Sequence, residues 1–375
     1  MHILFLSNEY PLWAPGGVGT FLQTFGRAMA ARGEDITILG VGDEKVEKQI
    51  DDQGVKIIRL PKNTSKLPNF LYNAVKINKR LKEIQGKQPI DIIESAELGL
   101  AIISRKHHAK KVIRLHGGHH FFAEAEKRGI NWRKGLLEKR SFGRADGFIA
   151  VSGYVKSHTA KYLSYRDKPV EIINYPINTD IIPPSVEINK DRILFAGTVC
   201  EKKGVRELIL AFHELRKKYP EKHLDLYGRD WYYPDGRSYI TSLRDTYDAE
   251  FFENVHFHGT IPREELNKRY AEASFCIFPS HMETQGLVTL EAMLLEKPVI
   301  FSLYGPGQET IEHEKTGLLC DVYDPKDIAE KMKWIIENPD ASTEMGKVAR
   351  QKVLKKYDIC TILDRNLSFY ESLRS

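Results

Sequence analysis

Short apolar runs alternate along the whole chain with longer segments of helical period, and this alternation constrains the fold more than any other feature. The runs are continuous rather than polar at every second position, which is typical of strands that helices cover on both faces of a parallel sheet. In the first half we expect strands at 3–6, 36–41, 55–60, 92–93, 112–115, 148–151 and 172–173. In the second half we expect them at 193–195, 224–227, 255–257, 275–278, 299–301 and 317–319. The pattern predicts an α/β protein with two doubly wound parallel sheets.

A polar stretch at 178–190, which contains Pro183 and Pro184, separates the two series of strands and helices. With 375 residues the chain is long enough for two domains. We therefore predict one domain at 1–180, a second at 181–357, and a last helix at 358–375 that packs back on the first domain. If two such domains face each other, the carboxyl ends of their strands enclose a deep cleft in which ligands bind.

The composition excludes several classes of protein. The four cysteines lie far apart and form no CxxC pair, which argues against a zinc knuckle or a disulfide framework and favours a reducing compartment. The first residues, MHILFLSNEYP, have no charged region before a short apolar run, so we expect a buried first strand of a cytoplasmic protein. No motif for nucleic acid is present, and no metal or other cofactor is expected.

One segment, Lys127 to Arg144, is basic and carries aromatic and aliphatic residues between its charges. The simpler interpretation is a solvated helix face whose apolar side packs inward. The alternative is reversible contact with an anionic membrane, which would place the protein at the inner face of that membrane. The residues concerned are Lys127, Arg128, Trp132, Arg133, Lys134, Leu136, Leu137, Lys139, Arg140, Phe142 and Arg144.

A glycine-rich loop, SNEYPLWAPGGVGT, follows the first expected strand and leads into a helix at 20–32. Gly16 and Gly17 would let the backbone approach an anionic ligand at the start of that helix. The loop is not a dinucleotide fingerprint, because Leu22 stands where its last glycine is required. A flexible turn without a ligand is the alternative.

Two further motifs follow expected strands. His116, in IRLHGGHH, lies at the carboxyl end of a strand, where its ring could hydrogen-bond a sugar hydroxyl or a phosphate. Lys203, in GTVCEKKG, could neutralise a diphosphate just before a helix. A structural histidine and a solubilising lysine are the ordinary alternatives.

The strongest motif is PSHMETQGLVTLEAM, in which Glu283 and Glu291 form the pattern E-x7-E. The first carboxylate falls in a loop and the second in the helix that follows. Amides at the start of that helix could hold phosphate while the two carboxylates accept hydrogen bonds from hydroxyls, which suits a sugar nucleotide. These amides belong to Gln285, Gly286, Leu287 and Val288.

Together these motifs resemble the retaining glycosyltransferases of family four, which have the GT-B fold of two Rossmann-like domains. The resemblance covers nearly the whole chain and includes YGPGQETIEHEKTGLL and the segment NYPINTD. It implies transfer of a hexose-type sugar from a UDP- or GDP-sugar to a glycan, a lipid-linked acceptor or a small molecule. Surface polysaccharide or lipid-linked glycan assembly is common in the family.

The resemblance also implies a role for each motif. Glu283 would bind the donor sugar and Glu291 the ribose. Lys203 and the amides of 285–288 would contact the diphosphate, with Gly16 and Gly17 beside it, and His116 would face the transferred sugar. The family's usual proposal is front-face displacement without a metal, in which the leaving phosphate helps to deprotonate the acceptor.

Two positions depart from the family pattern. Thr198 stands where an arginine is usual, so one partner of the diphosphate is missing unless Arg229 or Arg263 replaces it. Glu296 stands where a glycine usually ends the E-x7-E helix, so it must be capped differently or adopt a left-handed conformation.

Three other functions share parts of this pattern. A nicotinamide dehydrogenase would have the same fold class but lacks its fingerprint here. A two-lobed sugar-binding protein would share the cleft but needs no lysine–glutamate constellation. A GT-B sugar-nucleotide epimerase would bind the same donor and use no acceptor.

Overall fold

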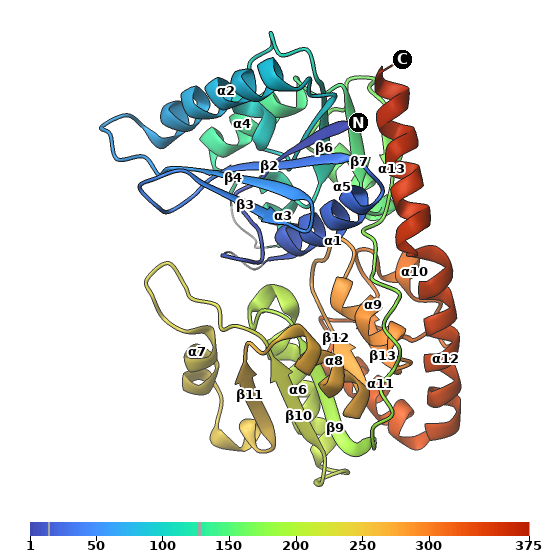
Figure 1. The fold of residues 1–375 in the computed structure, drawn as a ribbon. Helices are drawn as coiled ribbons and strands as arrows, with labels where there is room; N and C mark the ends of the chain where they lie inside the picture. Colours follow the sequence, from blue (N-terminus) through green and yellow to red (C-terminus); the bar gives the residue numbers. More distant parts are fainter. Residues whose placement is uncertain (14–15, 126–128, 375) are drawn as a thin grey trace. The chain divides into compact units, whose positions relative to one another are not determined.

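In a computed structural model, which describes residues 1–13, 16–125 and 129–374, the chain forms two compact units (Figure 1). The first unit comprises Met1–Pro176 together with Ile359–Ser375, and the second comprises Ile177–Asp358. Each unit has its own predominantly parallel sheet with helices packed against it. The predicted α/β class with two doubly wound sheets is confirmed.

The sheet of the first unit has eight strands in the order β3-β4-β2-β1-β5-β6-β7-β8. Its central strands are buried: the side chains of Ile3 and Leu4 in β1 are fully covered. All pairs are parallel except that of β3 with β4. The strands are β1 (His2–Leu6), β2 (Asp35–Val41), β3 (Lys48–Asp52), β4 (Val55–Leu60), β5 (Ile92–Ser95), β6 (Lys110–Leu115), β7 (Gly147–Ala150) and β8 (Val170–Ile172).

The helices of the first unit connect these strands and end with the C-terminal helix of the chain. They are α1 (Gly17–Ala31), α2 (Asn69–Lys87), the 3-10 helix η1 (Gly99–Ile102), α3 (His119–Ala125), α4 (Trp132–Phe142), α5 (Gly153–Ala160) and α13 (Ile359–Arg374).

The sheet of the second unit has six parallel strands in the order β11-β10-β9-β12-β13-β14. They are β9 (Asn189–Ala196), β10 (His223–Tyr227), β11 (Val255–Gly259), β12 (Ala273–Phe278), β13 (Val299–Ser302) and β14 (Leu318–Cys320). The helices are η2 (Glu201–Lys203), α6 (Val205–Arg216), α7 (Tyr239–Thr246), η3 (Ala249–Phe252), α8 (Arg263–Glu272), α9 (Leu287–Leu294), α10 (Gly307–Thr310), α11 (Pro325–Glu337) and α12 (Pro339–Lys356).

Strand β3 is absent from the sequence-based expectation. Its sequence, KQIDD, contains one apolar residue, and all five of its residues pair with β4 in one antiparallel ladder at the edge of the sheet. An exposed edge strand needs no continuous apolar run, so periodicity does not reveal it.

Helix α1 begins at Gly17, three residues before the expected start, and ends before Gly33, whose positive φ of 90° suits its position after the helix.

The boundary between the units lies a few residues before the expected position at 180. The amide of Ile177 donates a hydrogen bond to the carbonyl of Tyr357 at 3.1 Å, and Ile177 forms a bridge with Asp358. These bonds tie the connecting segment to the end of α12, so the segment belongs to the second unit from Ile177 onward.

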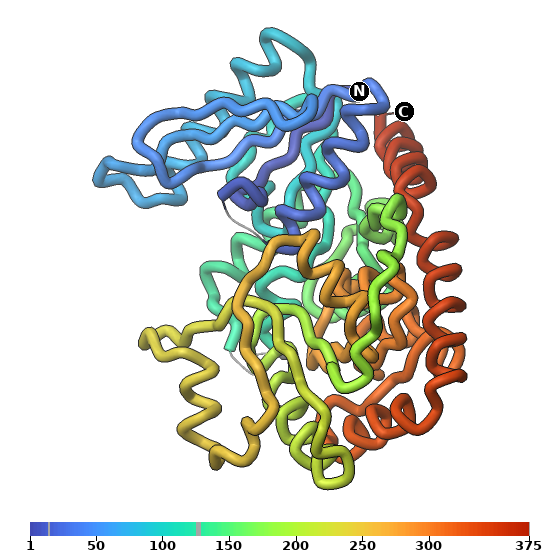
Figure 2. Tube along the Cα trace, turned by 60° about the horizontal axis from the view of Figure 1, so that its bottom comes forward, coloured from blue at the N-terminus to red at the C-terminus, as the bar shows by residue number. Residues whose placement is uncertain are grey.

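Helix α13 belongs to the first unit and is held there by a buried polar network. Arg114 of β6 donates to Glu94 Oε1 at 2.7 Å and to Asn366 Oδ1 at 2.6 Å. The Tyr370 hydroxyl donates to Glu94 Oε2 at 2.6 Å. All four residues are at most 1% exposed, and Figure 2 shows the two chain termini close together in this unit.

No helix in the described part of the chain combines the length and the apolar character needed to cross a membrane.

Candidate functional site

The loops at the carboxyl ends of the strands in the second unit are brought together by glycines. A Cβ atom on Gly228 would lie 1.8 Å from the carbonyl oxygen of Gly197, and one on Gly204 would lie 1.9 Å from that of Pro279. No larger residue fits at either place. The loop after β9, which includes GTVCEKKG, is thereby packed against the loop after β12, which includes Glu283.

Within this pair of loops, Lys203 and Glu283 form an ion pair between Lys203 Nζ and Glu283 Oε2. Both side chains are mostly buried, with exposed fractions of 20% and 17%. Burial opposes ionisation of Glu283, but the positive charge of Lys203 outweighs it and the pKa of the carboxyl lies below its ordinary value. The structure thus joins two predicted site residues that are 80 positions apart.

The start of α9 lies in the same loop region and presents backbone amides. Gly286 precedes the helix with φ 80° and ψ 59°, a left-handed conformation. A Cβ atom at this position would also lie 2.7 Å from Phe301 Cζ. Gln285 is buried, while Leu287 and Val288 are partly exposed at the first helical positions. The first amides of a helix have no partner within it, so this end is suited to an anion.

Glu291 lies in α9 and is 5% exposed. Burial raises the pKa of its carboxyl above the ordinary value, although an arginine opposes this increase. That arginine is Arg263, the first residue of α8, whose Nη2 lies 2.7 Å from Glu291 Oε1. In the sequence analysis, Arg263 appears only as a possible partner of the diphosphate. Its pairing with Glu291 could have been suspected only from its place just after β11, at the first position of α8.

Thr198, where the family pattern has an arginine, is partly exposed in the loop after β9. The neighbouring amide of Val199 donates to the carbonyl of Arg229 at 2.9 Å, so the backbone of Arg229 runs beside this loop. Arg263 is engaged with Glu291. Of the two named substitutes, Arg229 is the one whose backbone adjoins the position of the missing arginine.

One group of metal-capable side chains occurs among the described residues: Glu201, Glu207 and His281. Arg206 lies against both carboxylates, with Nη2 at 2.5 Å from Glu207 Oε1 and 3.1 Å from Glu201 Oε1. The hydroxyl of Tyr239 donates to the other oxygen of Glu201 at 2.7 Å. A guanidinium is already paired with both carboxylates of this cluster.

The other predicted residues belong to the first unit. Gly16 is extended (φ −174°, ψ 168°) and precedes α1, where no side chain caps the helix start. A Cβ atom on Gly16 would lie 2.6 Å from Glu9 Oε2. Gly17 is the first helical residue, with open space around its Cβ position. The start of α1 therefore offers backbone amides beside a closely packed turn.

His116 directly follows β6 and contacts Tyr175. Tyr175 belongs to the segment NYPINTD, but it has no role of its own in the sequence analysis. His116 Nδ1 lies 2.5 Å from the Tyr175 hydroxyl, and the two rings are stacked with an interplanar angle of 16°. Burial lowers the pKa of His116 to about 3, and the charge of Arg114 adds to this decrease. The imidazole is consequently neutral at any working pH, with its ring orientation set by Tyr175.

The basic segment contains helix α4, and its Lys127 and Arg128 lie outside the described residues. Trp132 and Leu136 are 69% and 60% exposed on this helix. Its basic residues Arg133, Lys134, Lys139 and Arg140 are exposed as well. Arg144 differs from them, because it is only partly exposed and donates to the carbonyls of Leu100 and Ala101 at 3.2 and 2.9 Å.

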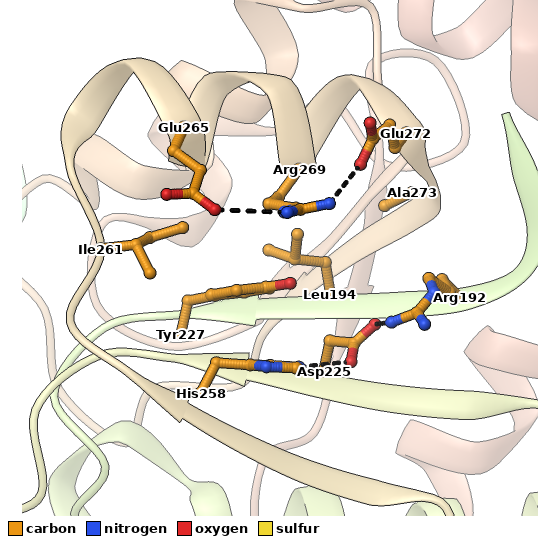
Figure 3. Close-up of a pocket in the computed structure, with 10 residues that line it drawn as sticks. All are labelled: Arg192, Leu194, Asp225, Tyr227, His258, Ile261, Glu265, Arg269, Glu272 and Ala273. Atoms are coloured by element: carbon orange, nitrogen blue, oxygen red, sulfur yellow. Dashed lines mark hydrogen bonds and ion pairs between the residues drawn. The ribbon is translucent and has the colours of Figure 1, made fainter. Parts of the chain in front are cut away.

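A cavity of about 360 Å³ lies beneath α8, over β9, β10 and β11 (Figure 3). Two ion-paired groups line it: Asp225 binds Arg192 and His258 at 2.5 and 2.6 Å. Arg269 binds Glu272 and Glu265 at 3.0 and 3.2 Å. Tyr227 stacks on His258 between the two groups. None of the residues predicted to bind the donor is among those drawn in Figure 3.

Comparison with known proteins identifies the family. Residues 178–352 match the family Glycosyl transferases group 1, and residues 15–181 match Glycosyltransferase Family 4. The chain belongs to the GT-B glycosyltransferases of family 4. It is therefore a nucleotide-sugar glycosyltransferase, and the predicted family, fold and enzyme class are confirmed.

Several relatives resemble this glycosyltransferase over nearly their whole length. Glycogen synthase of Mycobacterium tuberculosis is 22% identical over 99% of this chain and 94% of its own. A GDP-mannose-dependent alpha-(1-6)-phosphatidylinositol monomannoside mannosyltransferase of the same organism is 21% identical, over 95% and 94%.

Solved structures show the same fold. Sucrose-phosphate synthase from Thermosynechococcus elongatus superposes with a TM-score of 0.84 and 22% identity, covering 99% of this chain and 98% of its own. HepE of Anabaena, in complex with UDP and glucose, gives a TM-score of 0.79 and 17% identity, covering 99% and 100%.

Proposed function

We propose that this glycosyltransferase retains the anomeric configuration of a hexose-type sugar that it moves from a UDP- or GDP-sugar, and that it needs no metal. The observation that carries the proposal is the grouping of Lys203, Glu283 and the α9 amides on adjoining loops of the second unit. A lysine ammonium and helix-start amides can together neutralise a diphosphate. A neighbouring carboxylate can accept hydrogen bonds from sugar hydroxyls.

The donor would bind through residues at the start and in the middle of α9. Glu291 would accept hydrogen bonds from the ribose, and its pairing with Arg263 keeps a buried carboxylate available for this role. The amides of 285–288 and Lys203 would hold the diphosphate, with Thr198 and the backbone of Arg229 beside it. HepE was crystallised with UDP and glucose, and a mannosyltransferase relative is GDP-mannose-dependent, so both bases are represented among similar proteins.

Transfer would follow a front-face displacement. The bond between the anomeric carbon and the diphosphate oxygen breaks, the acceptor oxygen bonds to the same face of that carbon, and the acceptor proton passes to the departing phosphate. Lys203 would stabilise the charge that develops on the diphosphate, and positioning would supply most of the remaining acceleration. Neutral His116, held by Tyr175, would donate or accept a hydrogen bond at the transferred sugar rather than supply a positive charge.

Metal independence is supported by the side chains that occupy the one metal-capable group of the described residues. Arg206 is bound to both of its carboxylates, so a divalent ion would bind beside a positive charge that is already there. No such ion is required if Lys203 and the helix amides carry the diphosphate.

The acceptor would be a glycan, a lipid-linked sugar or a small molecule, and we propose a reversible contact of the first unit with an anionic membrane. Helix α4 supports this contact, because exposed Trp132 and Leu136 alternate with exposed basic residues. Helix α2 carries a second exposed apolar group near its start, with Leu71 and Val75 50% and 63% exposed. The protein would then act as a cytoplasmic, peripheral enzyme.

The test is incubation with a panel of UDP- and GDP-sugars and sugar acceptors, with release of nucleoside diphosphate as the first measurement. We expect release that depends on one donor, a product with the donor's anomeric configuration by NMR, and full activity in EDTA. A product of inverted configuration would refute the retaining mechanism. Loss of activity on chelation that manganese restores would refute metal independence. Conversion of the donor to its epimer without an acceptor would identify an epimerase instead.

A further inference from the structure

Two buried glutamates enclose the turn that carries His116. Glu97 follows β5 and is 4% exposed, and Glu138 lies in α4 and is fully buried. Between them runs the backbone of Gly117 and Gly118, which connects β6 to α3. Neither glutamate belongs to a motif of the donor site, and a fully buried carboxyl requires a local reason.

Glu97 and Glu138 bind three amides of this turn. The Gly117 amide donates to Glu97 Oε1 at 2.7 Å. The His119 amide donates to Glu138 Oε1 at 2.7 Å, and the His120 amide to Glu138 Oε2 at 3.1 Å. The His120 ring contacts the same oxygen of Glu138 through Nδ1. The two carboxyls therefore satisfy the buried backbone directly after His116.

The side chains of Glu97 and Glu138 both lie against Gly118. A Cβ atom at this position would lie 1.9 Å from Glu138 Oε1 and 2.9 Å from both Cβ and Cγ of Glu97. Gly117, with φ 94°, is in a conformation that favours glycine. The turn thus fits between the carboxyls only because it has no side chains there.

Two carboxylates so close together, and out of contact with water, cannot both be ionised cheaply. Burial raises the pKa of Glu97 to about 8 against the pull of the amides that bond it, and the charge of Glu138 adds to the increase. The titratable groups that face the pair are His120 of the turn and Tyr165, whose pKa the charge of Glu97 helps to raise, while His116 meets Glu97 through its backbone amide. The His119 ring faces away, since its Nε2 accepts from the Asn131 amide at 2.8 Å.

We propose that Glu97 and Glu138 are paired positioning residues, which hold the 117–120 turn between a protonated and an ionised carboxyl and thereby set the place of His116. Ionisation of Glu97 puts two negative charges on opposite sides of Gly118, and their repulsion moves the turn. This inference rests on the proposed role of His116 in the reaction. Ionisation of Glu97 would therefore lower the activity at alkaline pH, an effect that none of the proposed donor-binding residues would produce.

The experiment compares kcat and KM for the donor from pH 6.5 to 9.5 in the wild type, Glu97→Gln and Glu97→Ala. We expect the wild-type kcat to fall at least fivefold across an apparent pKa near 8 with little change in KM. Glu97→Gln, which is neutral and can still accept the Gly117 amide, should keep kcat within about threefold at pH 7 and lose this alkaline decline. Glu97→Ala should lower kcat at every pH. The exposed carboxylate of Glu83 on α2 gives the control Glu83→Gln, which should keep the wild-type profile.

A second measurement needs no activity. In protein with isotope-labelled histidines, the ring signals of His116, assigned with His116→Phe, should shift with a midpoint near pH 8 although the ring stays neutral. The shift should be absent in Glu97→Gln, or in Glu138→Gln if the first variant does not fold. A wild type that transfers no sugar would overturn the proposed function while the NMR midpoint still tests the pair. Transfer with an alkaline decline that Glu97→Gln leaves unchanged, or an NMR signal without that midpoint, would overturn the positioning role.

Discussion

Lys203 and Glu283 form an ion pair across the two loops that end β9 and β12, and both side chains are mostly removed from water. Each neutralises the other in the structure, so a diphosphate that approaches Lys203 must share its ammonium with Glu283. In the proposed donor site, this pair would place a positive charge beside the diphosphate and a carboxylate beside the sugar.

Replacing Lys203 by alanine should lower kcat by about 100-fold or more, because the charge that stabilises the departing diphosphate is lost. Lys202→Ala, the change at the neighbouring lysine, should cost much less. Steady-state kinetics with the correct donor provide the measurement. Equal losses in the two variants would show that general positive charge, rather than the Lys203 position, matters.

Glu283→Ala should reduce turnover more than the affinity for nucleoside diphosphate, since that side chain is assigned to the sugar.

Glu291→Ala should weaken nucleotide-sugar binding by about 1–3 kcal/mol, or roughly 5- to 150-fold in Kd, through loss of a buried acceptor for the ribose. Arg263→Ala leaves that buried carboxyl without its partner, so it should weaken binding in a way that depends on pH. Calorimetric titration of both single variants and the double variant measures the coupling, which we expect to exceed about 0.5 kcal/mol. Unchanged affinity in Glu291→Ala would remove this residue from the donor site.

Glu296→Gly should stabilise the second unit by about 0.5–1 kcal/mol. Glu296 follows the C-cap of α9 with φ 60°, and the bonds from Lys297 N to Ala292 O and from Glu296 N to Met293 O form a Schellman motif. Glycine removes the left-handed strain at the expense of a more flexible unfolded chain. Glu296→Ala keeps that strain and should show no gain, and thermal unfolding compares the two. Equal midpoints would mean that the conformation carries no cost here.

The burial of neutral His116 should make stability depend on pH on the acid side. Its pKa is lowered from 6.5 to about 3, so between these values the unfolded chain binds the proton that the folded chain excludes. This contribution to the free energy of unfolding is complete above pH 6.5 and falls as the pH decreases toward 3. Urea unfolding at a series of pH values should give a shallower slope for His116→Phe than for the wild type. Parallel slopes would contradict a buried neutral ring.

Trp132→Ser combined with Leu136→Ser should reduce binding to anionic vesicles, because the exposed apolar side of α4 is removed while its basic residues remain. The wild type should sediment with anionic but not neutral vesicles at low salt, and added salt should release it. Val348→Ser, at a 42% exposed apolar position of α12, is the control. A wild type that stays in the supernatant with both lipids would make α4 an ordinary solvated helix and favour a soluble acceptor.

Much of the fold could be predicted, because burial on both faces of a parallel sheet leaves continuous apolar runs in the chain. The run at 55–60 coincides with β4, and that at 224–227 lies within β10. The antiparallel edge strand β3 could not be predicted in this way, since its residues 48–52 are mostly polar and are defined by pairing with β4.

The sequence alone determined which residues stand at strand ends and helix starts, because local propensity and periodicity depend on near neighbours. It placed His116 at a strand end, Lys203 just before a helix, Glu283 in the loop after a strand and Glu291 in the helix that follows that loop. Only the tertiary structure decided their partners, as with Arg263 on Glu291 and Tyr175 on His116. Such contacts join residues far apart in the chain, and the burial that shifts a pKa exists only once distant segments have packed together.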